Sequence, residues 1–256
     1  MTNAQTLSRP FHRRRRENRG VQDLGWSTNR MTFSFSDYHD PDWMGFGALR
    51  VLIESEIDPH EGFSMHPHRN VDILSYVVNG TLRHRDSEGH KTDITPGEMQ
   101  LIRAGQRGIR HKETNPQDAP ERHYQFWLTP DAPTSASSYH ELDPYPEQRR
   151  AQLKLYASPN GRGRSMPLRT DAFVYAGLFT AGNTVRHPLS NDRGAWLQVV
   201  DGHVRLGDTE LRAGDGVGVT ADRSHLDLAF PADSNVLLID LFRPSLQDSS
   251  GPRRGQ

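Results

Sequence analysis

The sequence predicts an all-β protein built from two similar β units. Short segments of alternating apolar and polar residues recur about every 8–12 residues, with turn residues between them and no long helical period. The turns Asn79-Gly80 and Asp201-Gly202 occupy matching places in the two halves, and GTLRH at 80–84 corresponds to GHVRL at 202–206. A repeat of this kind indicates that one β unit, a sandwich or a barrel, has been duplicated.

Strands are expected in both halves wherever an apolar run or a period of two residues occurs. Asn79-Gly80 between two apolar runs favours a hairpin, because both central residues of such a turn must accept positive φ. The expected strands of the first half are 31–36, 46–53, 62–68, 73–78, 81–86, 99–103 and 124–128. Those of the second half are 173–180, 196–200, 204–206, 216–219 and 236–241.

The domain boundaries follow from shifts in composition. Residues 1–20 are polar and basic, which predicts a flexible N-terminal arm before a first barrel at 21–130. Proline, serine and alanine concentrate at 131–150, which predicts a linker to a second barrel at 151–243. The remaining residues, 244–256, are polar and rich in turn formers, and we expect a disordered tail.

Composition excludes several classes of protein. Cysteine is absent, so a disulfide framework, an iron–sulfur cluster and a cysteine nucleophile are ruled out. The formal net charge is −1, no apolar run approaches a membrane span, and the N-terminal segment lacks a hydrophobic signal core. We therefore expect a cytoplasmic protein without membrane or nucleic-acid partners. The oligomeric state does not follow from the sequence, and a monomer is favoured. The basic run at 13–16 is a nuclear address or phosphate-binding patch in one interpretation, and a solvated arm in the favoured one.

Two stretches, GFSMHPHRNVD and the later GQRGIRHKE, carry the clearest chemical pattern. On a strand, His66 and His68 share one face, and so do His111 and Glu113, because successive side chains point to opposite sides. Two such pairs can converge on one point. Three imidazoles and a carboxylate suit a divalent first-row metal and leave open positions for small ligands.

The other histidines are expected to be structural. The second half contains no His-x-His pair, so His187, His203 and His225 are assigned to packing or to the surface. His84 and Asp86 are expected to form turn and strand hydrogen bonds, because an acid beside a serine caps a turn readily.

The sequence resembles the pirin family of the cupin superfamily, in particular the bacterial pirin-like quercetin 2,3-dioxygenases. The residues that carry the likeness are HPHRNVDILSYVVNGTLRHRDSEG, PGEMQLIRAGQRGIRHKE and YQFWLTP, and it extends over about residues 20–242. The resemblance implies a bicupin, with two cupin-type barrels packed face to face and a degenerate site in the second barrel. It also implies one divalent metal ion, usually Fe(II) but also Zn, Mn, Ni or Cu, held by His66, His68, His111 and Glu113.

Two positions depart from the family pattern. Asp72 stands where glutamate is common, and we expect it to orient a ligand histidine, with direct metal contact as the alternative. Lys112 stands between two ligands where a small residue is common, and strand alternation turns it away from the metal.

The function implied by the resemblance is dioxygenation of a flavonol such as quercetin. The substrate would bind through its 3-hydroxyl, Glu113 would take the hydroxyl proton as general base, and addition of O2 would release CO. The aromatic wall is expected among Phe33, Phe35, Phe46, Met65, Tyr76 and Phe126. Two alternatives are open: a redox-sensitive regulator similar to transcription-cofactor pirins, marked by a basic patch that includes 13–16, Arg103, Arg107 and Arg110, and a structural barrel.

Overall fold

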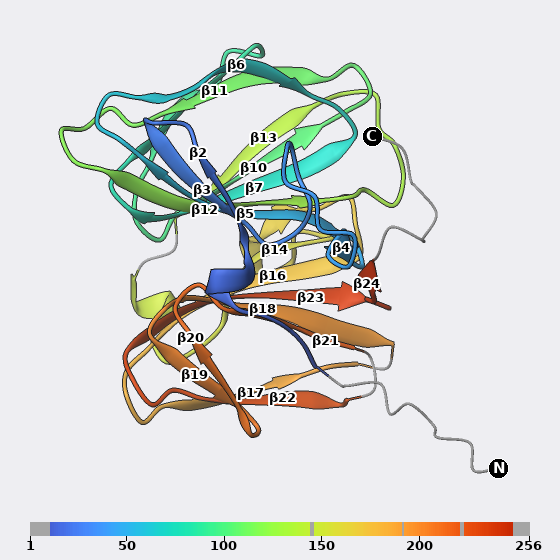
Figure 1. Cartoon of the computed structure of the whole chain (residues 1–256). Helices are drawn as coiled ribbons and strands as arrows, with labels where there is room; N and C mark the ends of the chain where they lie inside the picture. The colour runs from blue at the N-terminus through green and yellow to red at the C-terminus, as the bar shows by residue number, and fades with distance from the viewer. Residues whose placement is uncertain (1–10, 144–145, 191, 221–222, 248–256) are drawn as a thin grey trace.

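The computed structural model describes residues 11–143, 146–190, 192–220 and 223–247. The chain forms two β-barrels stacked on one another, so the predicted all-β class is confirmed (Figure 1). Each barrel has a large sheet that faces the other barrel and a small four-stranded sheet on its outer side. No helix in the described ranges has the length and apolar character needed to span a membrane.

Thirteen strands of the described residues form the first barrel. They are β2 (Gly20–Asp23), β3 (Ser27–Met31), β4 (Gly45–Phe46), β5 (Leu49–Ile57), β6 (Gly62–His68), β7 (Val71–Asn79), β8 (Leu82–Asp86), β9 (Lys91–Ile94), β10 (Met99–Ala104), β11 (Ile109–Thr114), β12 (Glu121–Leu128), β13 (Ser138–Leu142) and β24 (Leu246–Gln247). Its large sheet has the order β13-β10-β7-β12-β5-β3-β2, with β4 and β24 at the side of β5, and its small sheet has the order β6-β11-β8-β9.

The second barrel repeats this plan. Its strands are β1 (Phe11–Arg14), β14 (Lys154–Ser158), β15 (Met166–Pro167), β16 (Ala172–Phe179), β17 (Thr184–Pro188), β18 (Arg193–Asp201), β19 (His203–Leu206), β20 (Thr209–Arg212), β21 (Gly216–Val219), β22 (His225–Ala229) and β23 (Ser234–Phe242). The orders are β1-β21-β18-β23-β16-β14-β15 and β17-β22-β19-β20. Three short 3-10 helices, η1 (Arg16–Asn18), η2 (Pro146–Arg149) and η3 (Arg162–Arg164), lie between strands.

A shared hydrophobic core holds the two large sheets together. Leu74 of β7 and Trp196 of β18 both belong to it, and the Trp196 ring packs edge-on against Phe33 with centroids 5.0 Å apart. The next residue of β7, Ile73, packs instead with Ile109 of β11 inside the first barrel. Even positions of β7 thus point toward the second barrel, and odd positions point into the interior of the first.

The two predicted Asn-Gly and Asp-Gly turns form, but they are not hairpins. Gly80 and Gly202 have φ of 78° and 88°, the left-handed conformation that glycine adopts without strain. Among the described residues, however, β7 pairs with β10 and β12, while β8 pairs with β9 and β11. The turn at Gly80 is therefore a corner where the chain leaves the large sheet for the small one, and the turn at Gly202 serves the second barrel in the same way.

The strand expected at 31–36 is wrong. β3 ends at Met31, and the following residues leave the ladder, because Ser34 N–H donates to Trp43 O at 2.7 Å and Ser36 has φ of 51°. The alternation that suggested a strand has another cause. Phe33 lies in the core between the barrels, whereas Phe35 packs on Trp127.

The flexible arm expected at 1–20 is wrong for residues 11–20, while 1–10 lie outside the described residues. β1 pairs with β21 and covers an edge of the second large sheet. Arg13 bonds the Asp215 carboxylate at 2.8 Å, and the buried Arg19 bonds Glu54 at 2.9 Å. The basic run is ordered because carboxylates of both barrels face it.

The linker and the tail also contribute strands. β13 lies within the expected linker and pairs with β10 from Met99↔Leu142 to Arg103↔Ser138. β24 lies within the tail that was expected to be disordered and pairs with β4. Each segment completes the first barrel by occupying a free strand edge, a long-range match that composition does not reveal.

Candidate metal centre

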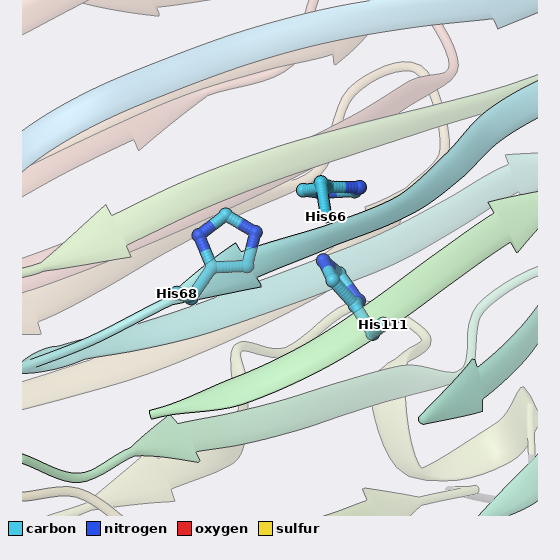
Figure 2. Close-up of side chains that lie close together, drawn as sticks. All are labelled: His66, His68 and His111. Carbon is cyan, nitrogen blue, oxygen red and sulfur yellow. The ribbon is translucent and has the colours of Figure 1, made fainter. Parts of the chain in front are cut away.

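Three histidines converge in the interior of the first barrel. β6 carries His66 and His68, and the neighbouring antiparallel strand β11 places His111 directly opposite His66. The ring centroids of His66 and His111 are 4.4 Å apart, and His68 lies 4.8 Å from each of them. Figure 2 shows the three rings turned toward one another above the two strands.

The nitrogens of these rings fit a bound cation. His68 Nε2 and both ring nitrogens of His111 are buried without a hydrogen-bond partner, and His66 turns Nδ1 toward the Ser64 carbonyl at 2.7 Å. Burial is the main cause that lowers the pKa of His68 to about 3 and that of His111 to about 4. Both rings therefore stay neutral and keep a lone pair for a ligand. A divalent cation would satisfy these atoms, which are otherwise left unpaired.

Glu113 is buried beside the histidines as a carboxylate. Burial alone would raise its pKa, but the surrounding histidines, His111 first, lower that pKa to about 2. Gln100 Nε2 and Ser75 Oγ donate to Oε1 at 2.5 and 3.2 Å, and Gln125 Nε2 donates to Oε2 at 2.8 Å. These hydrogen bonds hold the negative charge in one orientation.

The possible ligand atoms of the described residues form two groups, in each of which the atoms lie within 4.8 Å of one another. One group is His66, His68 and His111; the other is His84, His111 and Glu113. The predicted set of four ligands is thus divided between two groups that share His111. A register shift between β6 and β11 contributes to this division. His111 pairs with His66, but Glu113, two residues further along β11, pairs with Phe63, which is three residues away on β6.

His84 is the residue near the site that the sequence reasoning undervalued. It does bond Asp86, as expected, but its ring is buried, and Nδ1 has no hydrogen-bond partner. β8 places it directly opposite Glu113. The available signal was the H-x-D spacing on a strand, which puts both side chains on one face as H-x-H and H-x-E do.

The expectation that Asp72 orients a ligand histidine is wrong. Its carboxylate accepts hydrogen bonds from Nε and from the backbone N–H of Arg169, each at 2.7 Å. Asp72 occupies an even position of β7, on the face that packs against the second barrel, whereas Ser75 on the other face reaches Glu113. Asp72 therefore joins the barrels. Lys112 is half-buried between the buried His111 and Glu113 of β11.

The second barrel's histidines have individual carboxylate partners. His187 Nε2 lies 3.3 Å from Asp240, and His225 Nε2 lies 3.1 Å from Asp227. His203 bonds Glu210. Within the described ranges, the second barrel has no group of three ligand atoms comparable to those of the first.

The aromatic wall beside the histidines differs from the expected one. Phe33, Phe46, Tyr76 and Phe126 lie in the core between the barrels, and Met65 is exposed. Phe35, one of the expected residues, does lie near the site, with its ring 5.0 Å from that of Trp127 between centroids. Two aromatic contacts were not expected: Trp127 with His68 at 4.9 Å and Tyr139 with His84 at 4.7 Å between ring centroids.

The low pKa values of the buried histidines predict an acid-sensitive fold. Unfolded histidines protonate near pH 6.5, whereas folded His111 stays neutral to about pH 4. The unfolded state thus binds more protons in this window, and the free energy of unfolding of the metal-free protein should fall as the pH drops from 6.5 to 4. The His111 contribution is about 3 kcal/mol. Urea titrations across this range test it, and His111→Leu should show a shallower slope; an unchanged slope would contradict the assignment.

The two stacked barrels each combine a large and a small sheet, and the first barrel contains a cluster of imidazoles. These features define a metal-binding bicupin. The sequence profile described as Pirin matches residues 12–128, and the profile described as Quercetinase C-terminal cupin domain matches residues 155–241. The chain belongs to the pirin family, and the resemblance seen in its motifs is confirmed.

Individual relatives cover nearly the whole chain. A protein named quercetin 2,3-dioxygenase from Escherichia coli K12 is 36% identical over 233 residues, covering 89% of this chain and 97% of the relative. A pirin-like protein from Caulobacter vibrioides is 34% identical over 223 residues, covering 86% of this chain and 95% of the relative. The crystal structure of the Escherichia coli bacterial pirin YhhW in complex with nickel(II) matches with a TM-score of 0.85 at 33% identity, covering 91% of this chain and 99% of that one.

Proposed function

We propose that this chain is a metal-dependent dioxygenase that cleaves a flavonol such as quercetin with O2 and releases CO, acting as a cytoplasmic monomer. The observation that carries the proposal is the group formed by His66, His68 and His111, in which His68 Nε2 and both nitrogens of His111 lack a hydrogen-bond partner, beside the ionised Glu113 carboxylate. Relatives of similar length named quercetin 2,3-dioxygenase and the nickel(II) complex of a bacterial pirin support it.

The three histidines and Glu113 would hold one divalent ion, for which we propose Fe(II). When bound, such an ion supplies Lewis-acid and one-electron chemistry at open coordination positions. Glu113 is placed to accept the proton of the substrate's 3-hydroxyl, since it is ionised and its carboxylate is oriented by three donors. Trp127 packs against His68 and would hold the flat substrate while excluding water.

The reaction can be tested directly. Protein loaded anaerobically with Fe(II) and then given O2 should consume quercetin, measured by loss of its visible absorbance, and should release CO, measured by gas chromatography. Metal-free protein is the control. Loss of quercetin without CO, or an equal rate in the control, would refute the proposal.

Glu113→Gln removes the proposed base and keeps the three imidazole ligands. The amide keeps the size of the side chain but cannot take a proton, so turnover should fall by roughly 10²–10⁴-fold. The metal content after gel filtration should stay within a few-fold, because three imidazoles remain. Steady-state oxygen uptake and metal analysis give both numbers, and undiminished turnover would remove Glu113 from the chemistry.

The regulatory alternative depended on a free basic patch. Arg13 is paired with Asp215 at 2.8 Å, and the buried Arg14 is paired with Asp40 at 2.9 Å. These pairings neutralise two members of the expected patch, so they support the enzyme over the regulator.

A further inference from the structure

The second group of ligand atoms, His84, His111 and Glu113, contains one residue, His84, that has no place in the proposed reaction. It lies in the same barrel interior, formed by β8 and β11 instead of β6 and β11. All three side chains are buried. What requires explanation is why the fold brings a further imidazole to this point.

The orientation of His84 is fixed by Asp86. His84 Nε2 lies 3.2 Å from Asp86 Oδ2, and Asp86 is itself held by the backbone N–H groups of Glu88 and His90 at 2.9 and 3.0 Å and by His90 Nδ1 at 2.8 Å. A carboxylate at Nε2 makes that nitrogen the N–H donor, which leaves the lone pair on Nδ1. This is the arrangement in which metal-binding imidazoles are usually found.

Packing does not account for the free lone pair. The His84 ring stacks on Tyr139 with an interplanar angle of 17°, which explains the plane of the ring. Nδ1 nevertheless remains buried without a partner, a costly state for a polar atom. A cation bound to this lone pair, and to Glu113 and His111 of the same group, would remove the free-energy cost of leaving Nδ1 unpaired.

His111 provides the second, independent observation. Both of its ring nitrogens are buried without a hydrogen-bond partner. A histidine that binds one metal ordinarily has its other nitrogen hydrogen-bonded to a carboxylate, carbonyl or water. His111 belongs to both groups, and as a neutral imidazole it offers one lone pair, so it can bind a cation in either group but only in one at a time.

We propose that His84, His111 and Glu113 form a second cation position, deeper in the barrel than the position of His66, His68 and His111. Two imidazoles and one carboxylate suit a borderline divalent ion such as Ni(II), Co(II) or Zn(II). Glu113 can serve this position because its carboxylate already lies within reach of both rings. The proposal requires cation binding by the barrel and does not depend on flavonol cleavage.

The test removes the outer position and examines what remains. His66→Ala/His68→Ala leaves only His111 in the outer group but keeps the inner group complete. We expect this variant to retain one Co(II) per chain after gel filtration, with the visible d–d absorption of a nitrogen- and oxygen-bound ion. Adding His84→Ala should weaken Co(II) binding at least about 10–100-fold, whereas adding His187→Ala, in the second barrel, should leave it unchanged.

Two further measurements keep the result unambiguous. Near-UV circular dichroism establishes that each variant is folded, and His84→Gln replaces the alanine variant if that one does not fold. X-ray absorption of the Co(II)-loaded double variant should show two imidazoles, and one after His84 is replaced. Absence of Co(II) from the folded double variant, or binding unaffected by loss of His84, would overturn the inner position. Flavonol cleavage by the wild-type protein is measured separately and bears only on the proposed reaction.

Discussion

Replacing His111 with alanine is expected to abolish both metal binding and flavonol turnover. His111 is the residue common to both groups of ligand atoms, and it is fully buried with its nitrogens unpaired. Metal ions contribute several kcal/mol to the stabilisation of charge in such reactions, and each 1.36 kcal/mol corresponds to a tenfold change in rate. Turnover should therefore fall by at least about a thousandfold.

The measurement pairs metal analysis with oxygen uptake on the same preparation. His187→Ala is the matched control, because His187 is also a buried histidine on a short outer sheet but bonds only Asp240. It should keep its metal and its rate. If His111→Ala kept a stoichiometric ion and normal turnover, the catalytic centre would have to lie elsewhere.

Arg169→Ala should cause the largest loss of stability among single changes outside the core. Arg169 bonds Asp72 through Nε and its backbone N–H, both at 2.7 Å, and donates to the Val71 and Ala104 carbonyls at 2.9 and 2.8 Å. Alanine would remove the guanidinium partner of the fully buried Asp72 carboxylate and leave it only the backbone N–H bond from residue 169. Removing one partner of a buried pair costs about 3–5 kcal/mol.

Denaturant titration measures this cost, and Arg186→Ala provides the comparison. Arg186 bonds both carboxylate oxygens of Asp227, at 2.7 and 3.2 Å, but both side chains are exposed. Its loss should cost less than about 1 kcal/mol. Equal losses in the two variants would mean that the Asp72 pair does not join the barrels as described.

Local patterns predicted the parts of the fold that depend on neighbouring residues. β6 and β21 have the predicted boundaries because each is a short run ended by turn or loop residues. The H-x-H and H-x-E spacings placed the three histidines correctly because each spacing matches the two-residue period of a strand.

Features that depend on distant partners were missed. Asp72 meets Arg169, 97 residues away, and no local pattern reveals which face of β7 packs against a second barrel. Likewise, His84 faces Glu113 only because β8 and β11 are neighbours in the small sheet. Strand order decides such pairs, and a single sequence does not display it.

The exchange of terminal strands between the barrels determines how the protein unfolds. β1, near the start of the chain, completes the second barrel, and β24, near its end, pairs in the first. The halves are therefore interlocked, and a fragment cut at the middle of the chain would carry an open strand edge prone to association. The protein should melt as one cooperative unit, with neither half persisting after the other is lost.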